Sequence, residues 1–174
     1  YNTGTLFEYD WSAGTYSVKY NFAFATSGRW PLAEMVEVNG FLYGTTSSGG
    51  ALGGGTLFKY ELQGEQLTLL HDFENTSGQE SNQTLFVASN GLIYGTTRYG
   101  GLNSVGKLFS IDAATDTYTQ LQNFNPAVGT NPYSQLIEMP GNKLMGTAFE
   151  GGANNDVSIF EYDIALNTLT LKAS

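Results

Sequence analysis

The chain of 174 residues is long enough for one domain with a substantial hydrophobic core. It carries 16 acidic and 7 basic residues, and this net charge of −9 disfavours nucleic acid and anionic membrane surfaces as partners, because both require clustered lysine and arginine. The sequence lacks the apolar run of about 18 residues that membrane insertion needs, and with no cysteine it excludes disulfides and thiolate chemistry.

The opening residues 1–24 indicate the second half of a repeating unit. Residues 4–10 alternate apolar and polar side chains as a half-buried strand does, and residues 15–24 supply an antiparallel partner after a turn. The same strand pair is expected three more times, at residues 56–61 with 66–73, 107–112 with 118–124, and 158–163 with 168–172. One phenylalanine of each pair keeps a step of 51 residues, at Phe7, Phe58, Phe109 and Phe160.

The other half of each unit is a predicted hairpin. Residues 32–38 and 41–46 read as strands around Asn39-Gly40, a dipeptide that suits a tight turn in which both central residues have φ > 0. The second and third hairpins are expected at residues 85–97 and 136–148, around Asn90-Gly91 and Gly141-Asn142.

The repeat predicts the architecture. The stretch Leu42-Tyr43-Gly44-Thr45-Thr46 returns at residues 93–97 and, less faithfully, at 144–148, so the first glycine recurs after 51 residues both times. Four short strands per unit of this length are typical of a β-propeller blade. We therefore expect an all-β propeller segment of about 3.5 four-stranded blades, with a half blade at 1–24 and blades at 32–73, 84–124 and 135–173.

An arc of this size does not close a ring. We expect the chain to be a fragment of a longer polypeptide, whose further blades, or else a partner protein, complete the ring. In isolation, the apolar faces at the two ends of the arc are expected to cause self-association.

These motifs resemble the bacterial GloVer-type tandem repeats, whose signature reads roughly Gly-x-Leu-Tyr-Gly-Thr-Thr, then Gly-Gly, then Gly-Thr-Val/Leu-Phe. Residues 40–58 carry the clearest copy and residues 91–109 the next, whereas the third copy departs from the signature with Met145 and Ala148. The double glycine is also similar to that of kelch blades. The resemblance implies a propeller in a secreted or cell-surface bacterial protein, and it implies no particular reaction.

The sequence predicts no catalytic residue, metal site or cofactor. The glycine pairs precede strands rather than helices, so they do not form phosphate-binding loops. His71 is the only histidine and has no recurring partner, and the carboxylates lie mostly at strand ends. Glu150 with residues 154–156 offers oxygen ligands for Ca²⁺, but an ordinary polar loop explains that stretch better.

Two sets of loops vary from unit to unit and are expected on one face of the disc. One set joins strands two and three of a blade, and the other joins successive blades. Large aromatic and cationic side chains suit binding of glycan or protein because they offer contact area at low entropic cost. The candidate ligand-binding residues are Trp30, Arg98, Tyr99, Tyr133 and Phe149.

Three functions remain open from the sequence. The first is a non-enzymatic binding module that recognises glycan or protein through the aromatic side chains of these two sets of loops. The second is a purely architectural spacer, and the third is a polysaccharide-active enzyme that would use Glu34, Glu37 and Glu138 on the first strands.

Overall fold

The protein is built from antiparallel strands alone. A computed structural model describes residues 3–74, 76–152 and 156–174, and these ranges contain strands, turns and loops but no helix. Consequently, no helix in the described part of the chain is long and apolar enough to cross a membrane.

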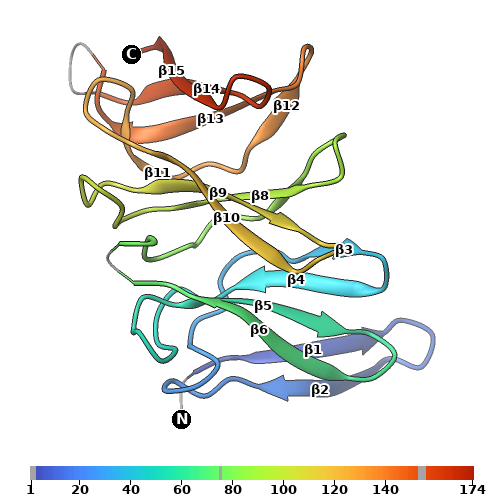
Figure 1. Ribbon diagram of the computed structural model, residues 1–174. Helices are drawn as coiled ribbons and strands as arrows, with labels where there is room; N and C mark the ends of the chain where they lie inside the picture. Colours follow the sequence, from blue (N-terminus) through green and yellow to red (C-terminus); the bar gives the residue numbers. More distant parts are fainter. Residues whose placement is uncertain (1–2, 75, 153–155) are drawn as a thin grey trace.

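The strands form four sheets that follow one another along the chain (Figure 1). The first sheet pairs β1 (Thr5–Asp10) with β2 (Thr15–Asn21). The second runs in the order β3 (Val36–Val38), β4 (Phe41–Thr45), β5 (Thr56–Glu61), β6 (Gln66–Asp72). The third contains β7 (Phe86–Val87), β8 (Ile93–Thr97), β9 (Lys107–Asp112) and β10 (Thr117–Asn123). The fourth contains β11 (Thr130–Pro132), β12 (Ile137–Met139), β13 (Lys143–Glu150), β14 (Ser158–Asp163) and β15 (Thr168–Ala173).

Strand alternation explains how neighbouring sheets pack. Phe58 and Tyr60 on β5 share a buried cluster with Leu6 and Phe22 of the first sheet. The intervening Leu57 shares a cluster with Phe109 of the third sheet. Because successive side chains point to opposite faces of a strand, β5 contributes to the core on both of its faces.

The strands β4, β8 and β13 are the second strands of the predicted blades, and β5, β9 and β14 are the third strands. A glycine on each of the second strands lies against the phenylalanine of the neighbouring third strand. Gly44 is opposite Phe58 in the β4–β5 ladder, and a Cβ atom there would come 2.7 Å from the ring atom Cζ. The corresponding distances are 2.4 Å for Gly95 and Phe109 and 2.6 Å for Gly146 and Phe160. The 51-residue step therefore preserves a contact that no larger residue permits.

A β-bulge recurs in the pairing of third and fourth strands. In the first sheet the register shifts between Leu6 and Phe7, which leaves Lys19 without an opposite residue. The shift returns at Leu57/Phe58 and Ile159/Phe160, and the third sheet has it on β10 between Gln120 and Gln122. Bulges bend a strand and raise its twist, so all four sheets acquire a similar curvature.

The structure corrects two details of the predicted blades. The first strands are shorter than the expected 32–38, 85–89 and 136–139, because only residues 36–38, 86–87 and 137–139 pair with the neighbouring strand. The fourth sheet has five strands rather than four, since β11 forms from a loop between units and pairs with the end of β13. The equivalent loops of the second and third sheets make single bridges, Arg29 with Ser48 and Gln79 with Tyr99.

The predicted Asn-Gly turns are not all alike. Asn39 and Gly40 both have positive φ, 54° and 84°, as expected of a two-residue hairpin turn. In the second hairpin only Gly91 has a positive φ, of 83°. There the Gly91 amide donates to the Ala88 carbonyl, and the Leu92 amide donates to the Asn90 side chain. A longer turn thus replaces the expected one.

The tips of the hairpins between third and fourth strands link adjacent sheets. One residue in each tip has positive φ and keeps the 51-residue step: Gly14, Glu65, Asp116 and Asn167. Three of these side chains reach back to the preceding sheet. Lys19 pairs with Glu65 at 2.6 Å, Lys59 pairs with Asp116, and Gln122 donates to Asn167 Oδ1 at 3.0 Å.

Prediction: truncating the repeated phenylalanine destabilises the third sheet much more than the first. Phe109 is 0% exposed and Phe7 is 56% exposed, although the two hold the same repeat position. We expect Phe109→Ala to lower the free energy of unfolding by about 3–5 kcal/mol, and Phe7→Ala to lower it by about 1 kcal/mol or less. Urea denaturation followed by circular dichroism measures both, and equal losses would contradict the packing described here.

Candidate functional site

The two predicted loop sets do lie on one face of the molecule. Figure 1 shows the tight turns gathered at one edge of the sheets and the longer loops at the other. Backbone hydrogen bonds join the two sets: the Arg29 amide donates to the Ser48 carbonyl at 2.7 Å and the Tyr99 amide to the Gln79 carbonyl at 3.1 Å. We call this surface the loop face.

Trp30 occupies a repeated left-handed backbone position. Its φ is 58°, and Glu80 and Asn131 match it at 53° and 55°. The three residues also make the same bond, because their amides donate to Thr3, Gly54 and Val105 respectively, in the loop or strand start of the preceding unit. Asparagine tolerates this conformation, whereas tryptophan is an unusual occupant.

Trp30 and Arg29 form the first cluster on the loop face. The Arg29 guanidinium carbon lies 3.9 Å from the centroid of the Trp30 ring and 4.7 Å from that of Phe24. Beside the cluster is a cavity of about 220 Å³, lined by residues of two successive loop pairs: Arg29, Trp30, Ser47, Ser48, Gly53, Gly54, Gln79 and Glu80.

Arg98 is the centre of the second cluster. Its guanidinium carbon lies 4.9 Å from the Tyr99 ring centroid and 5.6 Å from the Tyr133 ring centroid. Arg98 Nη1 is 3.8 Å from a carboxylate oxygen of Glu80, which also lines the cavity beside Trp30. The Asn131 side chain donates to the Arg98 carbonyl at 3.1 Å. Glu80 therefore connects the two clusters.

Phe149 takes a different place from the one expected. It belongs to β13 rather than to a loop, because β11 extends the pairing along that strand as far as Glu150. Its side chain is exposed, but it makes no aromatic or cationic ring contact with another described residue. The structure thus brings together Arg98, Tyr99 and Tyr133, sets Trp30 nearby, and leaves Phe149 apart.

Sequence reasoning overlooked the contributions of Arg29 and Glu80 to these clusters. Both lie in the variable loops that join successive units, but neither is among the candidate binding residues. One signal was available: the spacing of the glycines Gly28, Gly78 and Gly129 is 50 and then 51 residues, so one unit has lost a residue here. Allowing for that deletion aligns Trp30 with Glu80 and Asn131.

Two of the three carboxylates considered for catalysis, Glu37 and Glu138, are hydrogen-bonded at turns. Glu37 Oε1 accepts the Gly40 amide at 2.6 Å, and Glu138 accepts both the amide and the hydroxyl of Ser89 at 2.9 and 2.6 Å. No group of three or more His, Cys, Asp or Glu residues suited to a metal ion occurs within the described ranges. The possible calcium ligands Asn154 and Asn155 lie outside those ranges.

His71 packs in the seam between the second and third sheets, where 'seam' means the contact between two neighbouring sheets, and it does not face a candidate site. Its ring on β6 stacks on Tyr118 of β10, with centroids 3.9 Å apart and planes 10° from parallel. Burial lowers the pKa of His71 below its ordinary value of 6.5, although Asp72 and Glu74 partly oppose this effect. The residue therefore joins the second and third sheets in its neutral form.

Comparison with known proteins identifies the family. The chain belongs to the Gloeobacter/Verrucomicrobia repeat family, which it matches over residues 1–174. No curated protein matches it significantly. The match supports the tandem-repeat resemblance, while nothing links the chain specifically to kelch blades.

Solved structures show the fold of this repeat. The extracellular domain of a one-component-system candidate from B. thetaiotaomicron aligns with a TM-score of 0.64 at 14% identity, over 99% of this chain and 20% of that one. TolB from Acinetobacter baumannii aligns with a TM-score of 0.59 at 14% identity, over 98% and 38%. A PL25 ulvan lyase aligns with a TM-score of 0.59 at 16% identity, over 86% and 40%. The repeat is thus β-propeller-like, as predicted, and spans well under half of each of these proteins.

Prediction: acidification weakens the seam at His71. Because the folded pKa lies below the unfolded value of 6.5, the unfolded chain binds more protons as the pH falls below 6.5, and the folded state loses stability. We expect the free energy of unfolding to fall between pH 7 and pH 5.5.

The variant His71→Phe, which keeps an aromatic ring against Tyr118, should show a flatter dependence in denaturation series at each pH. Because His71 is the sole histidine, this variant removes all histidine titration, and the wild-type chain is the reference for comparison. Parallel pH curves for the two proteins would be inconsistent with this role.

Proposed function

We propose that this repeat is a non-enzymatic recognition module that binds its ligand on the loop face. The observation that carries the proposal is the pair of linked clusters, in which arginines stack on the half-exposed rings of Trp30, Tyr99 and Tyr133 beside a cavity. Rings held by stacked guanidinium groups are preorganised, which lowers the entropic cost of binding.

A neutral glycan is the ligand class that this surface suits best. Aromatic rings offer flat apolar area with a polar edge, which matches the faces of sugar rings. Glu80 and the net charge of −9 disfavour polyanions. A basic protein surface is the alternative ligand.

An architectural role is the second candidate, and a specific observation favours it. Trp30 and Arg98 also take part in seam bonds through their backbones: the Trp30 amide donates to the Thr3 carbonyl, and the Arg98 amide donates to the Glu80 carbonyl. On this reading the loop clusters rigidify the array and bind nothing. An enzymatic role has less support, because Glu37 and Glu138 already cap turns.

We further propose that the module works outside the cytoplasm, as a secreted or cell-surface protein. The family resemblance implies export, and one of the similar structures is an extracellular domain. The proposal also includes further blades of the same polypeptide, or a partner protein, as the cover for the two end faces of the array.

Prediction: removing the two loop-face aromatics weakens recognition while the fold persists. The double variant Trp30→Asn/Tyr99→Ala should weaken binding on a glycan array by about tenfold or more, because each ring contributes on the order of 1–2 kcal/mol of contact. Asparagine is chosen at position 30 because Asn131 holds the equivalent left-handed conformation.

The matched control is Trp11→Ala. Trp11 is 89% exposed and lies in the β1–β2 turn, on the opposite edge of the sheets from the loop face. Its loss should leave glycan binding unchanged. Binding that survives the double variant moves the site elsewhere, and a folded wild-type protein that binds no glycan and no protein leaves the architectural role.

A further inference from the structure

Within the described residues, the first sheet has an unpaired edge at β1, whose counterparts in the other sheets are paired on both sides. Phe7 places β1 at the repeat position of β5, β9 and β14. Each of those strands lies between two partners, such as β4 and β6 on either side of β5. Within the described residues β1 pairs with β2 alone. A free strand edge presents amide and carbonyl groups that can pair with another strand.

Phe7 also exposes the surface that a glycine covers elsewhere. The rings of Phe58, Phe109 and Phe160 lie against Gly44, Gly95 and Gly146 and are at most 1% exposed. These glycines belong to the second strands, which flank the third strand on the side that is free in β1. The contact between a phenylalanine ring and a glycine occurs three times in the molecule, and Phe7 supplies the ring of such a contact without the glycine.

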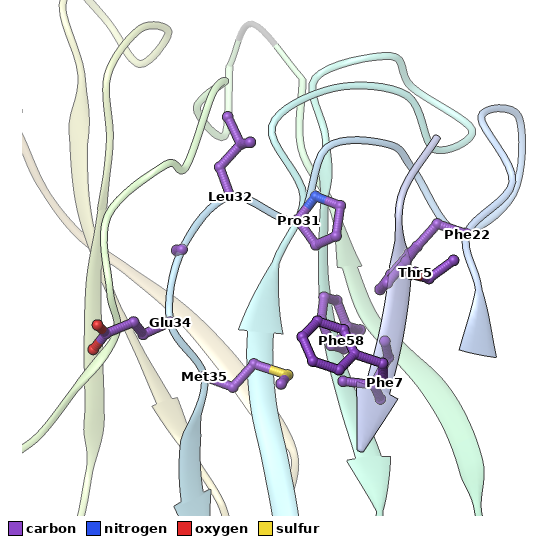
Figure 2. Close-up of a pocket in the computed structure, with 10 residues that line it drawn as sticks. Thr5, Phe7, Phe22, Pro31, Leu32, Glu34, Met35 and Phe58 are labelled. Carbon is purple, nitrogen blue, oxygen red and sulfur yellow. The ribbon is translucent and has the colours of Figure 1, made fainter. Parts of the chain in front are cut away.

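A groove runs beside this edge. Its volume is about 400 Å³, and it lies between β1 and the segment that leads to β3. Figure 2 shows Thr5, Phe7 and Phe22 on one side, Pro31 and Met35 on the other, and Phe58 between them, while Glu34 points away. The lining is chiefly apolar.

The next seam shows what fills the same space. Aligning Gly28 with Gly78 matches Pro31 to Ser81 and Met35 to Leu85. In that seam the Thr45 hydroxyl of β4 donates to the Ser81 carbonyl at 2.6 Å, and Tyr43 of β4 shares a buried cluster with Leu85. Leu85 is fully buried there, whereas Met35 is only partly buried. The strand Tyr-Gly-Thr-Thr is thus the natural occupant of such a groove.

We propose that the free edge of β1, together with this groove, binds an extended strand of the type apolar-Tyr-Gly-Thr-Thr. The strand adds antiparallel to β1, as β4 does to β5, so that its glycine lies on Phe7. Its tyrosine enters the groove toward Phe22 and Met35, and its first threonine hydroxyl donates to the Pro31 carbonyl. Backbone pairing supplies the affinity, and the glycine supplies the specificity, since a Cβ atom there would collide with the ring.

The occupant is a hairpin from an additional repeat rather than a second intact copy of this chain. Each Tyr-Gly-Thr or Met-Gly-Thr strand of the chain, β4, β8 and β13, already pairs along both edges. Lending one to another molecule would dismantle its own sheet. A further hairpin of the same repeat type has a free edge to offer.

A peptide corresponding to residues 36–48 tests the proposal in trans. We expect it to bind the 174-residue protein and to slow amide exchange in β1, while β5, which is paired on both sides, is unaffected. The peptide variant Gly44→Val should bind about tenfold or more weakly. A scrambled peptide of the same composition controls for non-specific adhesion.

Protein variants locate the contact. Phe7→Ala should weaken peptide binding, whereas Trp11→Ala, which removes a more exposed aromatic side chain from the adjacent turn, should not. Equal binding of the wild-type, Gly44→Val and scrambled peptides would overturn the proposal, as would exchange protection outside β1. The proposal would also be overturned if the protein self-associates, the peptide does not compete with this association, and the peptide does not protect β1. In that case a second copy of the chain would cover this face.

Discussion

The packing of a phenylalanine ring on a glycine determines how this array is assembled. Glycine inside a strand is normally unfavourable, because it leaves the backbone free and offers no side chain to pack. Here the absent side chain is the space in which the ring of Phe58, Phe109 or Phe160 lies. The same ring faces the preceding sheet. One residue therefore fixes the register within its own sheet and the distance to its neighbour, so strand pairing and sheet stacking are coupled.

Much of this arrangement was predictable because it follows from side-chain periodicity. The third strands at 56–61, 107–112 and 158–163 match their predicted bounds, since alternation and a fixed aromatic mark both ends. The first strands did not, because Phe86 and Val87 form a strand only through their pairing with β8. β11 was missed for a similar reason: the residues Thr130–Pro132 have no strand pattern, and their pairing depends on the exposed end of β13.

The candidate site was predictable as a face but not as a set of contacts. The sequence indicated that the two loop families share one side, and the backbone bonds of Arg29 with Ser48 agree. The stacking of Arg98 between Tyr99 and Tyr133 depends on which rotamers neighbouring loops permit, and no periodicity encodes that. The left-handed conformation of Trp30 was equally unpredictable from the sequence, because the residues at the same repeat position, Glu80 and Asn131, are chemically unlike tryptophan.

The hairpin tips give the array a defined sequence of neighbours. The pair formed by Lys59 and Asp116 lies in one seam, and the neutral pair Gln122 and Asn167 lies in the next. If the fourth sheet followed the second, Lys59 would meet an asparagine in place of a carboxylate and would lose the partner of a largely desolvated ammonium group. Duplicated units with identical cores are in principle interchangeable. Divergence at a few peripheral positions makes each junction selective, so a chain of near-copies folds in one order and resists mispairing between its own repeats.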